Sequence, residues 1–272
     1  MSDQPSPARS FGDVADAYDR ARPSYPAEAV AWALGDHPVT VLELGAGTGK
    51  LTETLVALGH DVHATDPDEQ MLAVLRAKLP DVRTSCSTAE EIPAPDASYD
   101  VVVVAQAFHW FDHERALPEI ARVLKPGGWL AVVTNTRDER IPWVRKLGVL
   151  IGSMTQVSSS EVLGASTIFG EVEEERFKNW QQIDRTSIQE LVLSRSNVAM
   201  LDEDGRRAKL AEVLAFYDDY GRGMDGMQLP YVTACRRAVV VEQVRSAPPV
   251  TTEEAPEKPA PPADDMLLID FR

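Results

Sequence analysis

The sequence has few cysteines, no long apolar run and no excess of positive charge. Its two cysteines, Cys86 and Cys235, lie far apart, which suits a reducing compartment better than a disulfide framework. Apolar stretches such as residues 101–105 are much too short to cross a bilayer. The polar N-terminus, MSDQPSPARS, lacks the apolar core of a secretory signal. We therefore expect a cytoplasmic protein that has no membrane partner.

The charge balance is strongly acidic, with 27 lysines and arginines against 43 aspartates and glutamates and a net charge of −16. Such a chain repels phosphate backbones, and its sequence shows no basic stripe with interleaved aromatic residues. Nucleic acid is therefore not an expected partner. The 272 residues, 44% of them hydrophobic, are enough for a substantial core.

Composition divides the chain into three zones. Residues 1–10 are predicted to be a flexible arm, and residues 11–245 a folded domain with a helical cap around residues 140–225. Residues 246–272 are rich in proline, alanine and glutamate and have little to bury, which predicts a disordered tail. Its last residues, MLLIDFR, are apolar enough to dock on the domain.

Strand and helix patterns alternate through the first half of the folded zone. Apolar strands are expected near residues 40–44, 61–65, 82–86, 99–107 and 129–136. Helices are expected between them, one with Asp66 as its N-cap and Pro67 as its first residue. Repeated βα units predict an α/β fold with a doubly wound, mostly parallel sheet, and two later strands, 176–184 and 227–241, form its antiparallel edge.

The stretch VLELGAGTGK places three glycines where the first strand ends and a helix begins. Gly45, Gly47 and Gly49 allow a tight turn and a close approach of a ligand to the backbone. Asp66 follows at the end of the second strand, where a carboxylate can accept hydrogen bonds from two ribose hydroxyls. This pairing predicts a nucleoside-containing cofactor at the carboxyl end of the sheet.

Two enzyme classes fit such a cofactor site. The dinucleotide fingerprint of dehydrogenases is G-x-G-x-x-G, whereas this loop reads G-x-G-x-G and follows the acidic Glu43. A cofactor with a sulfonium group and an ammonium group needs an acid and carbonyl groups rather than a pyrophosphate site. An NAD(P)-dependent oxidoreductase and a methyltransferase both remain open at this point.

Five ordered motifs carry a family resemblance: VLELGAGTGKLT, ATDPDEQML, STAEEIP, YDVVVVAQAFHWFD and RVLKPGGWLAV. Together they resemble class I S-adenosylmethionine-dependent methyltransferases. The chain is most similar to a small-molecule group that includes trans-aconitate and ubiquinone/menaquinone-biosynthesis methyltransferases. The resemblance covers roughly residues 11–134 and implies a seven-stranded, Rossmann-like sheet with an antiparallel edge strand and a helical lid.

The resemblance also implies roles for individual positions. The residues expected to bind S-adenosylmethionine are Glu43, Gly45, Ala46, Gly47, Asp66, Pro67, Met71, Ala89, Glu90 and Gln106. Among these, Asp66 would hold the ribose, Pro67 and Met71 would flank the adenine, and Gln106 would face the ammonium group. An N-terminal lid, FGDVADAYDRARPSYP, would place Tyr18 and Arg22 over the cofactor or the acceptor pocket.

The stretch QAFHWFDHE follows the fourth expected strand and contains two histidines four residues apart. His109 and His113 have the spacing of metal ligands on a helix, but the sequence near them offers no third ligand, so no metal is expected. His109 is instead a candidate general base, and Trp110 a candidate wall of the substrate pocket. His60 and His63 are expected at the surface. Tyr231, on the last strand, is a further candidate for substrate contact.

These patterns predict a transfer of a methyl group from S-adenosylmethionine to a small-molecule acceptor, which could be a hydroxyl, a carboxylate or an activated carbon. The sulfonium is a good leaving group, so the protein would mainly supply positioning and desolvation. Two alternatives remain: an NAD(P)-dependent oxidoreductase, and a non-catalytic regulator that binds S-adenosylmethionine.

Overall fold

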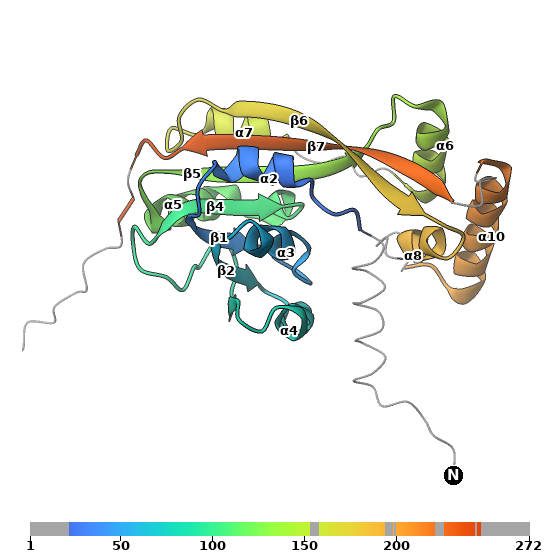
Figure 1. Ribbon diagram of the computed structural model, residues 1–272, viewed down its shortest axis with the longest axis horizontal. Coiled ribbons are helices and arrows are strands. Elements are labelled where there is room, and N and C mark those ends of the chain that lie inside the picture. The colour runs from blue at the N-terminus through green and yellow to red at the C-terminus, as the bar shows by residue number, and fades with distance from the viewer. Residues whose placement is uncertain are drawn as a thin grey trace, which may run out of the picture.

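A single seven-stranded sheet organises the molecule (Figure 1). The computed structural model describes residues 22–152, 158–193, 198, 200–220, 226–242 and 244–245. The strands are β1 Thr40–Leu44, β2 Asp61–Asp66, β3 Arg83–Cys86, β4 Tyr99–Ala105, β5 Leu124–Arg137, β6 Glu173–Ile183 and β7 Met227–Val239. Their order is β3-β2-β1-β4-β5-β7-β6.

Strand directions follow the predicted pattern. β1 to β5 pair with their neighbours in parallel, whereas β7 is antiparallel to both β5 and β6. The expectation of a mostly parallel, doubly wound sheet with an antiparallel edge is confirmed. The order reverses between β1 and β4, and at such a switch point the loops after the two strands diverge and leave a crevice for a ligand.

Helices cover both faces of the sheet because its central strands are apolar on both sides. In β4, residues 101–104 are four buried valines whose side chains alternate between the faces. One face packs against α5 (His113–Val123) and α7 (Ser159–Ala165). The other packs against α2 (Ala27–Leu34) and α3 (Lys50–Ala57).

The helix after β2 begins later than the sequence analysis expected. It is α4 (Glu69–Lys78), and its N-cap is Asp68, whose carboxylate accepts a hydrogen bond from the Gln70 N–H at 2.8 Å. Asp66 is still part of β2, so the predictions of Asp66 as cap and Pro67 as first helical residue are wrong. Two aspartates lie two residues apart here, and either could have capped the helix on composition alone.

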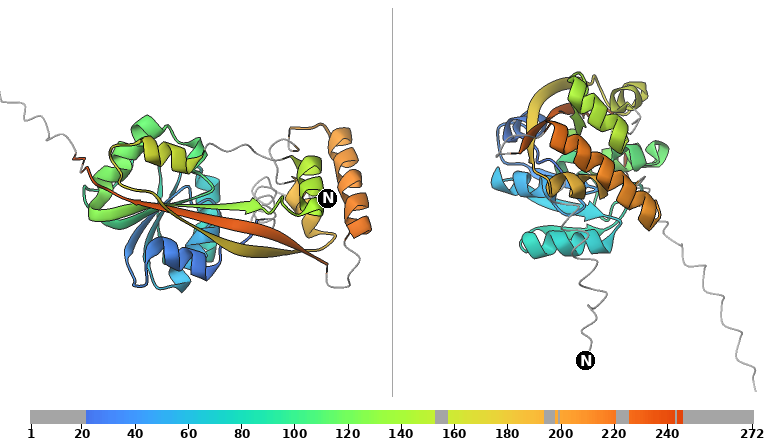
Figure 2. Two further views of the ribbon diagram at one scale, coloured as in Figure 1. Left: turned by 90° about the horizontal axis from the view of Figure 1, so that it is seen from above. Right: turned by 90° about the vertical axis from the view of Figure 1, so that its right-hand side faces the viewer.

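The last three strands are long and carry a second hydrophobic cluster. β5, β6 and β7 have 14, 11 and 13 residues, against about 5–6 for a typical strand. They extend away from the parallel strands to α6 (Pro142–Ile151), α8 (Ser187–Leu193) and α10 (Glu203–Tyr220) (Figures 1 and 2). These helices pack around Leu229 and Tyr231 of β7 and form the cap.

Two histidines that were expected at the surface are buried. His63 lies on β2 and contacts the Tyr99 hydroxyl at 2.6 Å and the Ser85 hydroxyl at 2.8 Å. Burial, with a contribution from Arg83, lowers the pKa of His63 to about 4. His60 is also buried, and the Val39 N–H approaches its Nδ1 at 3.3 Å. The alternation of polar and apolar residues along a short strand does not reveal that neighbouring strands supply polar partners in the interior.

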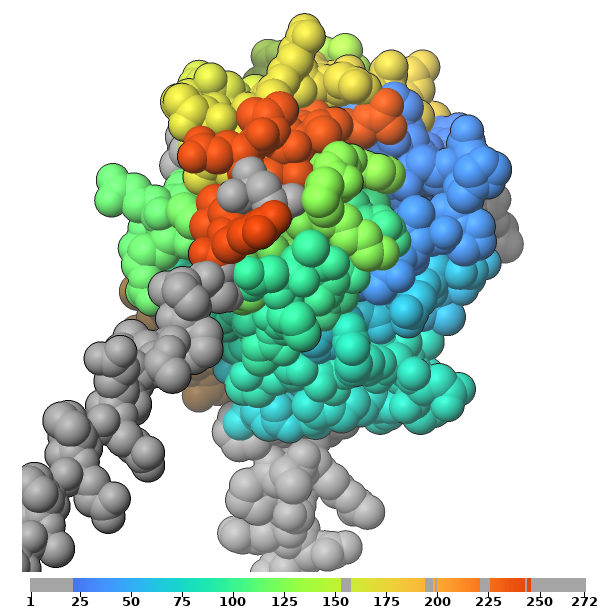
Figure 3. Space-filling view, turned by 90° about the vertical axis from the view of Figure 1, so that its left-hand side faces the viewer, coloured from blue at the N-terminus to red at the C-terminus, as the bar shows by residue number. Residues whose placement is uncertain are grey.

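At the end opposite the cap, segments from distant parts of the sequence meet. Figure 3 shows the end of β7 there beside segments from the middle and the beginning of the chain. Within the described residues no helix is both long and apolar enough to cross a membrane. The predicted arm, residues 1–10, and the predicted tail, 246–272, with its apolar end, lie outside the described residues.

Candidate functional site

The glycine loop after β1 depends on three left-handed backbone positions. Gly45, Gly47 and Gly49 have φ values of 72°, 57° and 88°. A Cβ atom on Gly45 would lie 2.5 Å from the Cβ of Ala107, and one on Gly49 would lie 2.9 Å from Cγ of Leu75. No described atom lies within 4 Å of a Cβ placed on Gly47. Two glycines therefore serve packing, and Gly47 faces open space.

Asp66 connects this loop to the end of β2. One of its carboxylate oxygens accepts a hydrogen bond from the Gly47 N–H at 2.8 Å, and the other accepts one from the Asp68 N–H at 2.8 Å. Burial raises the pKa of Asp66, while these two hydrogen bonds act in the opposite direction. The carboxylate is thus held at the rim of the loop in one orientation.

Glu43 lies behind the glycine loop and is almost fully buried. Burial raises its pKa to about 8, against a lowering effect of the hydrogen bond that Thr52 Oγ1 donates to its Oε2 at 2.6 Å. The nearby Asp66 raises it further. At neutral pH, Glu43 is therefore mostly protonated until a positive charge comes close.

A cavity of about 430 Å³ opens in front of this loop, at the carboxyl ends of β1, β2 and β4. Its lining residues are Gly45, Gly47, Asp66, Pro67, Asp68, Met71, Ser87, Thr88, Ala89, Glu90, Ala105, Gln106, Ala107, Trp110 and Phe111. The sequence analysis singled out nine of them for cofactor or substrate contact. Three of these lining residues are carboxylates, and none of them is a lysine or an arginine.

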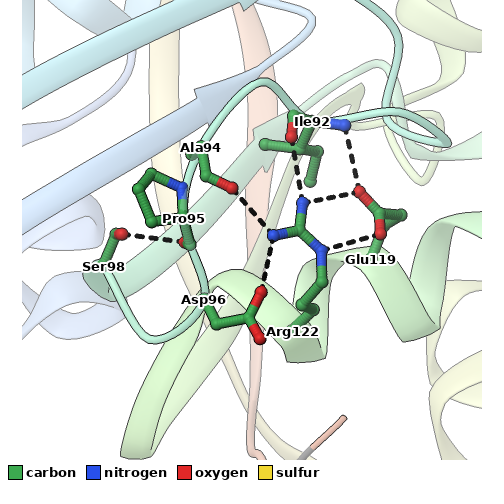
Figure 4. A network of polar contacts seen from close by, with 7 residues as sticks. All are labelled: Ile92, Ala94, Pro95, Asp96, Ser98, Glu119 and Arg122. Carbon is green, nitrogen blue, oxygen red and sulfur yellow. Dashed lines mark hydrogen bonds and ion pairs between the residues drawn. The ribbon is translucent and has the colours of Figure 1, made fainter. Parts of the chain in front are cut away.

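The wall formed by the loop after β3 is held by an arginine. Arg122 of α5 donates to the carbonyls of Ile92 and Ala94 and forms ion pairs with Asp96 and Glu119 (Figure 4). Glu119 in turn accepts a hydrogen bond from the Ile92 N–H at 3.1 Å. This network anchors the segment that directly follows Ala89 and Glu90.

Glu90 also has a structural partner. Its Oε1 accepts a hydrogen bond from the Asp112 N–H at 2.8 Å. Burial would raise the pKa of Glu90, but this bond, the Thr88 side chain and the charge of Arg115 outweigh burial and lower it. The group is therefore an ionised hydrogen-bond acceptor at the cavity wall.

A smaller cavity of about 100 Å³ adjoins the first, and both are lined by Gly45, Gly47, Ala105 and Gln106. Its other lining residues include Arg22, Ala46, Lys50 and Asn135. Gln106 takes a left-handed conformation, with φ 61°, and its Nε2 donates to the Asn135 carbonyl at 2.8 Å. Such a conformation is uncommon for a residue with a side chain and is held here by these contacts.

The remaining candidates lie in different places. Trp110 lines the larger cavity and is 74% exposed, whereas Tyr231 packs in the hydrophobic cluster of the cap. His109 lies in a short 3-10 helix, Phe108–Trp110, and its buried Nε2 has no hydrogen-bond partner in the described chain. Burial lowers the pKa of His109. Tyr18 lies outside the described residues.

His109 and His113 do not share a helix, because His113 begins α5. The ring of His113 instead bonds to the Phe108 carbonyl at 2.9 Å. Among the residues that the structure describes, no group of three potential metal ligands comes together.

Sequence reasoning missed several residues of the two cavities. Ser87 and Thr88 follow β3 directly, Asp68 follows β2, and Asn135 lies near the end of β5. All four obey the same rule that identified Asp66, namely that ligands bind outside the carboxyl ends of parallel strands. Applying that rule to every strand end would have found them.

Known proteins share this architecture. Residues 42–132 match a family model described as a methyltransferase domain. An uncharacterized methyltransferase of Mycobacterium tuberculosis is 46% identical over 234 residues, which cover 85% of this chain and 96% of that relative. Another uncharacterized methyltransferase, from Schizosaccharomyces pombe, is 36% identical over 215 residues, which cover 74% of this chain and 85% of that relative.

A solved structure supports the same assignment. A protein from Anaeromyxobacter dehalogenans, proposed to be a type II methyltransferase, superposes with a TM-score of 0.63 at 25% identity. The match covers 83% of this chain and 99% of that structure. The chain belongs to the class I S-adenosylmethionine-dependent methyltransferases.

Proposed function

We propose that the protein binds S-adenosylmethionine across the two adjoining cavities and transfers its methyl group to a small-molecule acceptor. The observation that carries this proposal is the position of Asp66. Its carboxylate lies at the end of β2, is bonded to the glycine loop, and faces a cavity of about 430 Å³. That volume is in the range of small-ligand sites, about 300–1,000 Å³.

The residues present fit the charge distribution of this cofactor. Asp66, Asp68 and Glu90 line the larger cavity, which suits a cationic ligand without phosphate groups. Arg22 and Lys50 line the smaller cavity, where the cofactor carboxylate would lie. Gly47 leaves room for a ligand beside the backbone. A dinucleotide, with its pyrophosphate, would meet carboxylates instead of cations.

Each group then has a distinct task. Asp66 would accept hydrogen bonds from the ribose hydroxyls, and Pro67, Met71 and Ala89 would enclose the adenine. Glu90 would accept from the adenine amino group. Gln106 would place a carbonyl or its side-chain oxygen at the ammonium group, with Glu43 behind it. Ala46 would leave the loop backbone accessible.

When bound, the cofactor supplies an electrophilic methyl group on a sulfonium that leaves readily. The protein's own contribution is to align the acceptor with that carbon and to keep water away. Trp110 and Phe111 provide an apolar wall at the larger cavity. For a hydroxyl acceptor, the neutral His109 ring would accept the proton at Nε2, which has no partner among the described residues and would have to turn toward the larger cavity for this step. Tyr18 and Arg22 would cover the site.

Titration calorimetry tests the cofactor assignment. We expect S-adenosylmethionine and S-adenosylhomocysteine to bind and NADH not to bind. Binding of NADH alone would favour the oxidoreductase alternative and contradict the proposal. Incubation with a metabolite extract and methyl-labelled cofactor then separates enzyme from regulator, because a regulator would bind the cofactor without labelling any metabolite. We propose that this takes place in the cytoplasm and without nucleic acid as a substrate.

A further inference from the structure

A second, larger cavity of about 750 Å³ lies between the long strands and the cap. It is lined by β5, β6 and β7 together with residues of α6 and α7 and the turn before α6. The lining residues are Thr134, Thr136, Arg137, Asp138, Glu139, Arg140, Arg145, Ser158, Ser159, Arg176, Phe177, Lys178, Val232, Ala234 and Arg236. We call it the basic cavity.

Its charge is opposite to that of the rest of the molecule. The cationic lining residues are Arg137, Arg140, Arg145, Arg176, Lys178 and Arg236. The acidic ones are Asp138 and Glu139, so the lining carries six positive and two negative charges in a chain whose net charge is −16. Gathering cations at one concave place in an acidic protein creates a local attraction for anions.

Part of this positive charge is already compensated. Arg140 forms an ion pair with Asp138, Arg137 forms a longer one with Glu139, and Glu174 pairs with both Arg236 and Arg176. Arg145 directs its Nε to the Glu139 carbonyl at 3.0 Å, which satisfies a donor without neutralising the charge. Lys178 is exposed on β6. The cavity therefore retains positive charge after its internal pairs are counted.

The side chain of Arg137 provides an independent observation that points to an anionic ligand. It is only 8% exposed, and its Nη2 donates to the Gly152 carbonyl at 3.1 Å and lies 3.7 Å from Glu139. Its Nε is buried and has no hydrogen-bond partner among the residues that the structure describes. A buried guanidinium donor without a partner destabilises the fold, because its lost hydration is not replaced by a hydrogen bond. An anion in the cavity would satisfy it.

The basic cavity lies beside the cofactor site along β5. Thr134 and Thr136 line the basic cavity, while Asn135 between them lines the smaller cofactor cavity and accepts the hydrogen bond of Gln106. Successive side chains of a strand point to opposite faces, so one strand end separates the two sites. Because β5 ends at Arg137, two residues after Asn135, an acceptor anchored at Arg137 would have to reach the cofactor site past the end of that strand.

We propose that the basic cavity binds the methyl acceptor and that the acceptor is a small anion carrying carboxylate or phosphate groups. The identification of the ligand as the acceptor rests on the function proposed above. Arginine forks match both of these oxyanions in geometry, and the cavity volume suits a metabolite. Arg137 and Lys178 would contribute the two main charges, one buried and one at the rim.

The test measures anion binding separately from cofactor binding. Succinate, inorganic phosphate and the uncharged succinamide are titrated by calorimetry at low ionic strength into the full chain, with and without S-adenosylhomocysteine. We expect succinate or phosphate to bind and succinamide not to bind, and the stronger of the two anions indicates the acceptor group. Equal binding of succinate and succinamide, or no binding of either anion, would overturn the proposal.

Variants locate the site. Lys178→Glu and Arg137→Met should each weaken anion binding about tenfold, the equivalent of 1.4 kcal/mol, while the affinity for S-adenosylhomocysteine stays within twofold. Arg137→Lys should restore part of the loss. Arg207→Glu makes the same charge change as Lys178→Glu on the exposed face of α10 and should leave anion affinity unchanged. Because Lys178 is exposed, its variant tests the site even if Arg137→Met does not fold. An equal effect of Lys178→Glu and Arg207→Glu would contradict a local site.

Turnover then identifies the anion as acceptor. A metabolite extract is divided by anion exchange before it is incubated with methyl-labelled cofactor, and labelled product should form from the retained, anionic fraction. Lys178→Glu should raise the KM for that fraction more than it lowers kcat. Labelling from the unretained fraction alone would overturn the acceptor assignment. If S-adenosylhomocysteine fails to bind while succinate binds at Lys178, the proposed function fails and the anion site remains.

Discussion

The cavity proposed to bind the cofactor, which we call the cofactor cavity, and the basic cavity differ in both charge and origin. The first is lined by three carboxylates and formed by loops that follow β1 to β4, all between residues 45 and 111. The second is rich in arginine and assembled from β5, β6, β7 and cap segments between residues 134 and 236. One chain thus places a site suited to a cation beside a site suited to an anion.

This difference explains why only the first was foreseen. Each part of the cofactor cavity follows a strand, and its chemistry is visible as a local motif such as LGAGTG or TDPD. The basic residues of the second cavity are scattered over about a hundred positions and come together through strand pairing. For example, Arg137 of β5 lies opposite Tyr231 of β7, and Lys178 of β6 lies opposite the next residue, Val232. Residue spacing in the sequence does not predict such clustering.

The largest expected effect concerns His109, which lies after β4 between the cavity-lining Ala107 and Trp110 but lines neither cavity itself. If it acts as the general base, His109→Gln should lower turnover about 10²- to 10⁴-fold. Burial lowers the pKa of His109, so the neutral base should persist at pH 7 and wild-type turnover should fall only below about pH 6.5. The pH dependence of kcat for the two proteins checks this.

The exposed His37 supplies the matched control, because it precedes the amino end of β1, whereas the proposed chemistry lies at the carboxyl ends of the strands. His37→Gln should leave the pH dependence unchanged. Equal turnover of the wild type and His109→Gln from pH 5 to 9 would remove the base role and would agree with a carboxylate acceptor, which needs no base.

The next effect separates the two cavities directly. Asp66→Ala should weaken cofactor binding about 30- to 1000-fold, or roughly 2–4 kcal/mol, because the charge-assisted bonds to ribose are lost. Its affinity for succinate should stay unchanged. Calorimetry with both ligands gives the comparison, and Asp204→Ala on the exposed surface of α10 is the control. A folded Asp66→Ala protein with normal cofactor affinity would contradict the ribose contact.

Gly45 and Gly47 both line the cofactor cavity, but only Gly45 is also restricted by close packing. Gly45→Ala forces a left-handed backbone and a contact of 2.5 Å with Ala107, so we expect a loss of roughly 2–4 kcal/mol in unfolding free energy. Gly47→Ala should lower the unfolding free energy only by the strain of the left-handed backbone, about 1–2 kcal/mol, but should weaken cofactor binding. Urea denaturation and calorimetry measure the two quantities, and equal stability losses would refute this difference.

The smallest expected effect is the release of a proton from Glu43 when the cofactor binds. The pKa of Glu43 is about 8, so this group is mostly protonated at pH 7 in the free protein. A cationic cofactor in front of it should lower that pKa and release up to one proton. Calorimetry in buffers of different ionisation enthalpy counts the proton, and Glu43→Gln should abolish the release. Without ligand, the stability from this group is complete below pH 4.5 and is lost as the pH rises through 8.

Much of the parallel part of the sheet could be predicted from local sequence patterns. β1 begins and ends at the predicted residues, and β2 extends one residue beyond its prediction to Asp66. The helix after β2 starts two residues later than expected, because Asp68 rather than Asp66 caps it. The wrong prediction that His63 lies at the surface has a different cause, because its partners Tyr99 and Ser85 come from two other strands.

By itself, the sequence determined the order of βα units, the glycine loop and the acid after the second strand. Hydrophobic periodicity and the need for glycine in left-handed conformations involve only a few neighbouring residues, so both can be recognised from the sequence alone. Only the tertiary structure decided which carboxylates face one cavity, that Glu43 is buried enough to hold its proton, and that six distant cations line another. Burial and charge clustering depend on what packs across strands, and that is a property of the folded chain alone.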